Sequence, residues 1–178
     1  MATGTPKGYV LLVDDEDPIR ESLEELLTVC GFKIYNANCV DNGIKVLEKQ
    51  DDIEAIVSDL KMPGKTGIDL LHWLNENNRE IPVIFLTGYG TLETCQEAVR
   101  EGAFDYVLKP IDDKDKILFP LRHAIDKYRL IKNNEELKID ILRMAEEHEK
   151  LLDSLLSDSQ TKDKVQEKIN SILKKWEK

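Results

Sequence analysis

Five polar side chains of this 178-residue chain follow or end short apolar runs. Asp14 and Asp15 come after "YVLLV", Asp59 comes after "IEAIVS", Thr87 ends "IPVIFLT" and Lys109 ends "FDYVLK". Carboxylates that lie close together repel one another and raise one another's pKa unless a cation lies among them. A hard divalent ion such as Mg²⁺ relieves this repulsion with oxygen ligands, and it keeps several waters. If these residues meet, they predict a magnesium site beside a hydroxyl and an ammonium group.

The apolar runs that carry these residues alternate with segments of helical period. Five runs have the length and composition of strands, several of them continuous enough to be buried on both faces: residues 9–13, 33–37, 53–58, 81–87 and 104–109. Strand and helix alternating five times predicts an α/β fold, with right-handed crossovers and a parallel sheet covered by helices on both faces. Ligands of such sheets bind at the carboxyl ends of the strands, so the polar residues are expected to share that edge.

Helix punctuation agrees with this alternation. Asp17 stands before Pro18, as an N-cap followed by a first-turn proline would, and Gly31 follows the first helical pattern. Pro120 lies inside the last helical pattern of this region, which predicts a kink or a helix that begins near it.

Four short segments together resemble the receiver domain of two-component response regulators. They are the acidic pair "DD" (14–15), "SDLKMPGKTG" (58–67), "LTGYG" (86–90) and "FDYVLKP" (104–110), each at a predicted strand end. The resemblance covers residues 8–128. It implies a flavodoxin-like, doubly wound sheet of five parallel strands in the order 2-1-3-4-5.

The resemblance also implies roles for the acidic residues. Asp59 matches the phosphoacceptor, a carboxylate nucleophile that takes a phosphoryl group from a histidine kinase or a small donor. Asp15, Asp59 and the backbone carbonyl of Lys61 would hold Mg²⁺, and Asp14 would act through a water. A protein of this kind is a signalling phosphoacceptor rather than an enzyme.

The remaining matched positions would complete a switch. Lys109 would pair with the acceptor carboxylate and then with a phosphoryl oxygen, while the Thr87 hydroxyl would bond another oxygen. Pro110 matches a family proline that often follows a cis peptide. On phosphorylation Thr87 would move toward the phosphate and Tyr106 would turn inward, which would change the surface of the fourth helix, fifth strand and fifth helix.

Charge and composition exclude several classes of protein. The net charge of -10 belongs to residues 1–128, which carry 24 acidic and 14 basic side chains, whereas residues 129–178 carry 11 of each. Phosphate binding needs clustered Lys and Arg, so no nucleic-acid partner is expected for this chain itself. No stretch approaches the roughly 20 apolar residues of a membrane span, and the start lacks a signal-peptide core, which predicts a cytoplasmic protein. The three widely spaced cysteines indicate neither disulfides nor a zinc site.

Residues 129–178 predict a helical extension with a heptad seam. After Asp112 the pattern continues as one long helix, and from Leu130 the seam advances in steps of four and three: Leu130, Asn134, Leu137, Ile141, Met144, His148, Leu151 and Leu155. This stripe is too narrow for a globular core. It favours a parallel coiled coil in a homodimer through residues 130–155, in which Asn134 sets the register.

A hairpin is the structural alternative for the same extension. "SDSQTKD" (157–163) breaks the pattern, and a second apolar stripe follows: Val165, Ile169, Ile172, Leu173 and Trp176. This stripe could fold back on the first helix, as a hairpin that does not bind DNA, or meet its copy in a dimer.

Several functions stay open. The chain could be a small regulator that signals through a dimerising tail, or the receiver and signalling helix of a longer protein with an effector beyond Lys178. His148, in "AEEHEKLL", faintly resembles the phosphorylatable histidine of a kinase dimerisation helix and would make the chain a phosphorelay intermediate. A flavodoxin-like nucleotide binder would share the fold but would not need Lys109 or the three aspartates.

Overall fold

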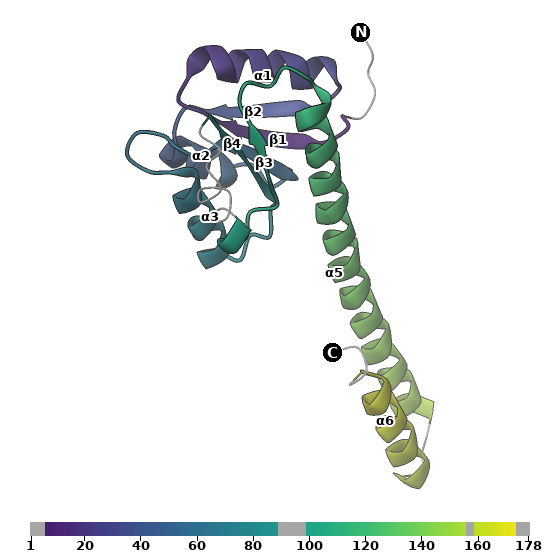
Figure 1. The fold of residues 1–178 in the computed structure, drawn as a ribbon. Helices are drawn as coiled ribbons and strands as arrows, with labels where there is room; N and C mark the ends of the chain where they lie inside the picture. Colours follow the sequence, from purple (N-terminus) through teal and green to yellow (C-terminus); the bar gives the residue numbers. More distant parts are fainter. Residues whose placement is uncertain (1–5, 89–98, 156–158, 174–178) are drawn as a thin grey trace. The chain divides into compact units, whose positions relative to one another are not determined.

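The computed structural model describes residues 6–88, 99–155 and 159–173. Five parallel strands form one sheet in the order β2-β1-β3-β4-β5, which confirms the predicted α/β fold and strand order. The strands are β1 (Tyr9–Val13), β2 (Lys33–Ala37), β3 (Ala55–Asp59), β4 (Val83–Thr87) and β5 (Asp105–Leu108). Figure 1 shows the sheet with helices on both sides.

Both faces of the sheet are buried because successive residues of each strand point to opposite sides. Val10 and Leu12 of β1 pack in one cluster with apolar residues of α1 (Asp17–Val29) and α5 (Asp115–Leu155). Leu11 and Val13 pack in a second cluster with apolar residues of α2 (Val40–Leu47) and α3 (Gly67–Glu76). The apolar runs that predicted strands therefore supply the two cores of the domain.

The strand register brings the carboxyl ends of the strands to one edge. Val13 pairs with Ser58, Asp59 pairs with Leu86, and Thr87 pairs with Leu108. The polar residues that follow these positions in the sequence therefore share this edge.

The first helix begins one residue earlier than predicted. Glu16 is its N-cap, because the Glu16 carbonyl accepts the first helical hydrogen bonds, from the N–H groups of Ile19 and Arg20. Asp17 is thus the first helical residue, not the cap, and its carboxylate pairs with Arg20. Gly31 follows the helix at φ 96°, in the left-handed region that glycine favours, as expected.

The chain divides into two compact units, residues 1–130 and 131–178. Helix α5 begins at Asp115, includes Pro120 near its start and runs without interruption to Leu155. The last two residues of "LTGYG", 89 and 90, lie outside the described residues. None of the described helices is both long and apolar enough to cross a membrane.

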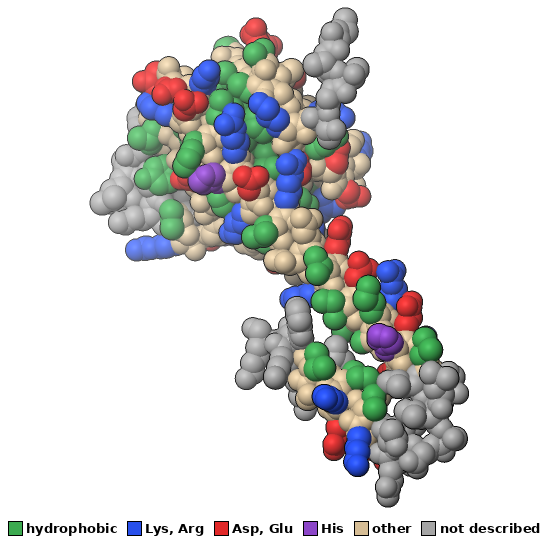
Figure 2. Space-filling view, turned by 90° about the vertical axis from the view of Figure 1, so that its right-hand side faces the viewer, with side chains coloured by type: hydrophobic (Ala, Val, Ile, Leu, Met, Phe, Trp, Pro, Cys, Tyr) green, Lys and Arg blue, Asp and Glu red, His purple; other side chains and the backbone are tan. Residues whose placement is uncertain are grey.

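The second unit contains the end of α5 and α6 (Ser159–Leu173), which begins inside the predicted break. Figures 1 and 2 both show α6 alongside the C-terminal part of α5, as in the hairpin alternative. Ile141 and Ala145 of α5 and Val165 and Ile169 of α6 are half-buried. Four seam residues of α5 are more than half exposed in the single chain: Leu130, Leu137, Met144 and Leu151. The fold of the single chain thus leaves most of the predicted seam uncovered.

Candidate functional site

Three carboxylates meet at the carboxyl edge of the sheet. Asp14 follows β1 and is fully buried, and Asp59 ends β3 with 7% of its surface exposed. One carboxylate oxygen from each of Asp14, Asp15 and Asp59 lies within 4.8 Å of the others. The structure therefore brings together the three acidic residues that the sequence predicted for a metal site.

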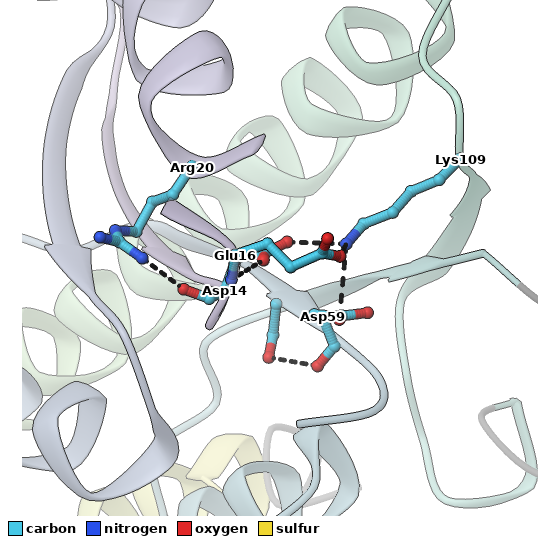
Figure 3. A network of polar contacts seen from close by, with 6 residues as sticks. Asp14, Glu16, Arg20, Asp59 and Lys109 are labelled. Carbon is cyan, nitrogen blue, oxygen red and sulfur yellow. Dashed lines mark hydrogen bonds and ion pairs between the residues drawn. The ribbon is translucent and has the colours of Figure 1, made fainter. Parts of the chain in front are cut away.

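Lys109 reaches across this acidic pocket from the end of β5 (Figure 3). Its Nζ lies 2.8 Å from Asp14 Oδ2, 3.4 Å from Asp59 Oδ2 and 3.7 Å from Glu16 Oε1. The ammonium group was expected beside the acceptor carboxylate, but its nearest partner is Asp14. The Lys109–Pro110 peptide is cis, as in the family pattern.

Burial and charge shift the pKa values of the central pair. Burial raises the pKa of Asp59, and the Asp14 charge adds to this, although the Lys109 ammonium and a hydrogen bond from the Lys61 backbone oppose it. Burial alone would lower the pKa of Lys109, but the hydrogen bond to Asp14 and the charges of Asp59 and Asp14 together raise it. Lys109 thus stays an ammonium group, whereas a full charge on Asp59 is costly without a further cation.

The segment after β3 is packed tightly against Asp59. The N–H of Gly67 donates to the Leu60 carbonyl, and Thr66 caps α3 through a reciprocal capping box with Asp69. A Cβ on Gly67 would lie 2.5 Å from the Asp59 carbonyl oxygen and 2.7 Å from Phe85 Cε1. Only glycine lets the start of α3 come this close to the residue that ends β3.

Two contacts at this edge were not predicted from the sequence. The Arg20 guanidinium donates to the Asp14 backbone carbonyl at 2.7 Å, and the Glu16 N–H donates to Asp14 Oδ1 at 2.8 Å. Together they fix the turn that carries Asp14 and Asp15. Glu16 could have been identified from its place in the acidic segment "VDDED". No local pattern in the sequence identifies Arg20 as a residue of the site.

Thr87 and Tyr106 lie on the two neighbouring strands. Thr87 is buried at the end of β4, whereas Tyr106 on β5 is 39% exposed. Phe85 on β4 pairs with Tyr106 on β5. Thr87 therefore lies two residues beyond Phe85, toward the sheet edge that carries the three carboxylates. The exchange of the Thr87 hydroxyl and the Tyr106 ring that the resemblance implies stays a prediction.

The acidic pocket fits a hard divalent cation. Its donors are carboxylate oxygens, which suit Mg²⁺ or Mn²⁺, and no described cysteine belongs to the cluster. Asp14, Asp15 and Asp59 are the residues that would hold such an ion. The role of the Lys61 carbonyl as a further ligand stays a prediction.

The comparisons with known proteins agree with this fold. The sequence profile of the response regulator receiver domain matches residues 10–119. The chain therefore belongs to the response regulator receiver domain family.

Two curated relatives show how far the similarity extends. The C4-dicarboxylate transport transcriptional regulatory protein DctD of Pseudomonas aeruginosa is 32% identical over 163 residues, which are 92% of this chain and 34% of DctD. The regulatory protein AtoC of Escherichia coli is 39% identical over 110 residues, 61% of this chain and 23% of AtoC. The chain thus spans about a third or less of the length of these relatives.

Solved structures give the same fold. A response regulator receiver domain protein from Clostridium thermocellum has a TM-score of 0.65 at 29% identity, covering 70% of this chain and 98% of that one. Full-length FixJ from B. japonicum has a TM-score of 0.66 at 28% identity, covering 80% of this chain and 70% of that one.

Proposed function

We propose that the chain is a phosphoacceptor of two-component signalling and that Asp59 takes a phosphoryl group from a histidine kinase. The observation that carries the proposal is the meeting of the Asp14, Asp15 and Asp59 carboxylates with the Lys109 ammonium at one sheet edge. Phosphoryl transfer depends mainly on in-line positioning and on neutralising phosphoryl oxygens, and these residues are suited to both tasks.

In the proposed reaction an Asp59 carboxylate oxygen attacks phosphorus while the bond to the leaving group breaks and its electron pair departs with that group. Mg²⁺ held by Asp14, Asp15 and Asp59 would neutralise phosphoryl charge and relieve the repulsion among the carboxylates. Lys109 already lies 3.4 Å from Asp59 Oδ2, so a small shift from Asp14 would bring its ammonium to a phosphoryl oxygen.

The readout of phosphorylation begins at Thr87. Its hydroxyl would move to a phosphoryl oxygen, and the ring of Tyr106, now partly exposed, would turn into the space that it leaves. The surface formed by the segment before β5, by β5 and by the start of α5 would change with it. A local change of charge is thereby converted into a change of partner surface.

The tail would pass the signal on as a homodimer. Leu137, Met144 and Leu151 are each more than half exposed, although they share one stripe of α5. Figure 2 shows hydrophobic side chains on the surface of this unit. A second copy of the chain is the occupant that fits a heptad stripe with Asn134 in its seam, because a buried Asn pair favours one parallel register.

A longer regulator is the second candidate. The similarity to DctD extends over 92% of this chain and so includes most of residues 131–178. Because DctD is a transcriptional regulatory protein of which this match covers 34%, the chain would then be the receiver and signalling helix that control a separate effector. The length of the natural open reading frame distinguishes the two candidates.

A relay through His148 is a third, weaker candidate. His148 is exposed on α5, as a phosphorylatable histidine must be. Unchanged phosphotransfer from an upstream kinase in a His148→Gln variant would eliminate this role.

Intact-protein mass spectrometry after incubation with acetyl phosphate and Mg²⁺ tests the proposed function. The wild type should gain one phosphoryl group and Asp59→Asn should gain none. Equal gain in both proteins would place the acceptor elsewhere. No gain by the folded wild type, from acetyl phosphate or from a kinase, would refute the proposal.

A further inference from the structure

A bidentate ion pair holds α5 against the sheet at the edge opposite the acidic pocket. Arg129 Nε lies 2.6 Å from Glu54 Oε1, and Arg129 Nη2 lies 3.0 Å from Glu54 Oε2. The Glu54 side chain is only 14% exposed, and the two residues are 75 positions apart in the sequence. Paired donors of this kind fix orientation as well as distance, because the planar guanidinium matches both carboxylate oxygens.

The same carboxylate also holds the start of the first strand. Glu54 Oε2 accepts the backbone N–H of Tyr9 at 3.0 Å, and Arg129 Nη2 donates to the Lys7 carbonyl at 3.1 Å. In Figure 1 the beginning of β1 lies beside α5. The pair therefore joins three elements: the residues before β1, the residue before β3, and the helix.

Gly8 gives an independent sign that this junction is tight. A Cβ on Gly8 would lie 2.6 Å from Ile125 Cδ1 of α5 and 3.2 Å from Glu54 Oε2. The backbone at the start of β1 thus approaches both the helix and the carboxylate so closely that a larger residue would displace one of them.

The junction of Glu54 and Arg129 lies far from the acidic pocket. Arg129 is nevertheless on α5, the helix whose start would change on phosphorylation. Glu54 precedes β3 and Asp59 ends it, so about 16 Å of strand separates the two edges. Helix α5 starts after β5 at the acidic edge and runs about 21 Å to Arg129, one residue before the end of the first unit. A displacement at the start of α5 would therefore act on a helix that is fastened at Arg129.

We propose that Glu54 and Arg129 form an anchor that keeps this point of α5 on the sheet in both phosphorylation states. The anchor acts as a pivot: the switch moves the start of the helix, and Arg129 determines how that movement enters the tail. The effect on the tail rests on the proposed function; the anchoring of α5 does not. Glu54 and Arg129 are accordingly positioning residues, and neither touches the acidic pocket.

Two variants of the full chain remove the anchor with little change in shape. Glu54→Gln keeps an oxygen that can accept the Tyr9 N–H, and Arg129→Gln removes both guanidinium contacts to Glu54. Arg129→Lys keeps the charge but not the fork. Arg143→Gln is the matched control, because Arg143 lies on the same helix in an exposed pair, 3.1 Å from Asp140.

Hydrogen exchange measured by mass spectrometry tests the anchoring itself. Backbone amides in residues 121–130 should exchange about tenfold faster in Glu54→Gln and Arg129→Gln. The reason is that local opening of the helix no longer has to break the bidentate, charge-assisted hydrogen bonds between Arg129 and Glu54. Arg129→Lys should fall between them and the wild type, and Arg143→Gln should match the wild type. Wild-type exchange in both Gln variants would overturn the anchor.

Sedimentation equilibrium with and without beryllofluoride, a phosphoryl mimic, and Mg²⁺ tests the pivot. The ratio of the two dimer dissociation constants should approach one in Glu54→Gln and Arg129→Gln, while uptake of a phosphoryl group from acetyl phosphate stays at the wild-type level. An unchanged ratio in both variants would refute the pivot. If the wild type itself takes no phosphoryl group, the proposed function fails, and the exchange measurement alone decides the anchor.

Discussion

Asp59→Asn should stabilise the metal-free protein at pH 7, although it removes the proposed phosphoacceptor. The Asp59 carboxylate is buried and shares the pocket with two other carboxylates, one oxygen of each within 4.8 Å. Burial raises the pKa of Asp59 in spite of the nearby Lys109 ammonium, so its charge opposes folding. An amide of the same shape removes that charge.

The distances and the burial together give the size of this effect. Two unit charges 4.8 Å apart repel by about 3.5 kcal/mol at an effective dielectric constant of about 20, and the buried Asp14 carboxylate is such a neighbour of Asp59. The attraction to Lys109 at 3.4 Å is about 5 kcal/mol on the same basis. The cost of burying the Asp59 charge, which is the main reason that its pKa is raised, exceeds the remaining attraction, and we expect Asp59→Asn to gain about 1 to 2 kcal/mol of unfolding free energy.

The gain should depend on pH. Because the folded-state pKa of Asp59 is raised, the folded protein binds the proton more tightly than the unfolded chain does. The stability contributed by this proton is fully present below the unfolded pKa of about 3.9 and is lost as the pH rises through the folded pKa. The advantage of Asp59→Asn should therefore be smallest near pH 4 and should grow to its full size above the raised pKa.

Urea unfolding provides the assay, followed by fluorescence of the half-buried Trp73 in a Trp176→Phe background. Mg²⁺ at ten times its dissociation constant should stabilise the wild type by about 1.4 kcal/mol and the variant by less. Asp51→Asn is the control, since its side chain is 93% exposed, and it should stay within about 0.5 kcal/mol of the wild type. The reasoning is refuted if Asp59→Asn destabilises the metal-free protein by more than about 1 kcal/mol, or if Mg²⁺ stabilises both proteins equally.

Two further pairs of variants test the packing of the site and the tail. Gly67→Ala should lower the unfolding free energy by about 1 to 2 kcal/mol, because the clash with the Asp59 carbonyl outweighs the better helix propensity of alanine. Gly88→Ala, whose Cβ would meet no atom of the described residues within 4 Å, should change it by less than about 0.5 kcal/mol, and equal losses in urea titrations would contradict the clash. Leu137→Asp should weaken self-association about tenfold or more in sedimentation, whereas Ile139→Asp, equally exposed but outside the seam, should not. Equal behaviour of the two Asp variants would argue against a dimer through this seam.

The apolar runs predicted the parallel sheet and the edge that carries the site, because both follow from residue types along single strands, whereas the strand order came from the resemblance to receiver domains. Runs such as residues 9–13 and 81–87 are apolar on both faces, which only a covered parallel sheet satisfies. Asp59, Thr87 and Lys109 then share an edge because each stands at or just beyond a strand's carboxyl end.

Contacts between residues far apart in the sequence could not be predicted in this way. Glu54 and Arg129 meet across 75 residues, and no local pattern distinguishes them from other surface charges. Lys109 lies nearest Asp14 rather than Asp59, which depends on side-chain distances in the folded pocket. The N-cap of α1 is Glu16 rather than the predicted Asp17 for a local reason, because the Glu16 N–H donates to the side chain of Asp14 and fixes the preceding turn.

The tail shows a different limit. A narrow apolar stripe is satisfied by a second copy of the chain as well as by a helix that folds back, and the spacing of residues 130–155 is compatible with both. Because Ile141 is half-buried while Leu137 and Met144 stay exposed, α6 leaves room for a partner along the seam.

The claim that Asp59 is the acceptor is tested most directly by chemical mapping of the phosphorylated protein. Borohydride reduces an aspartyl phosphate to homoserine, so the protein is treated with acetyl phosphate and Mg²⁺, reduced, digested with trypsin and fragmented by mass spectrometry. We predict homoserine at residue 59 within the peptide 50–61, and at no other aspartate. Homoserine at residue 14 or 15, or its absence from a folded protein that has gained a phosphoryl group, would contradict the proposed role of Asp59.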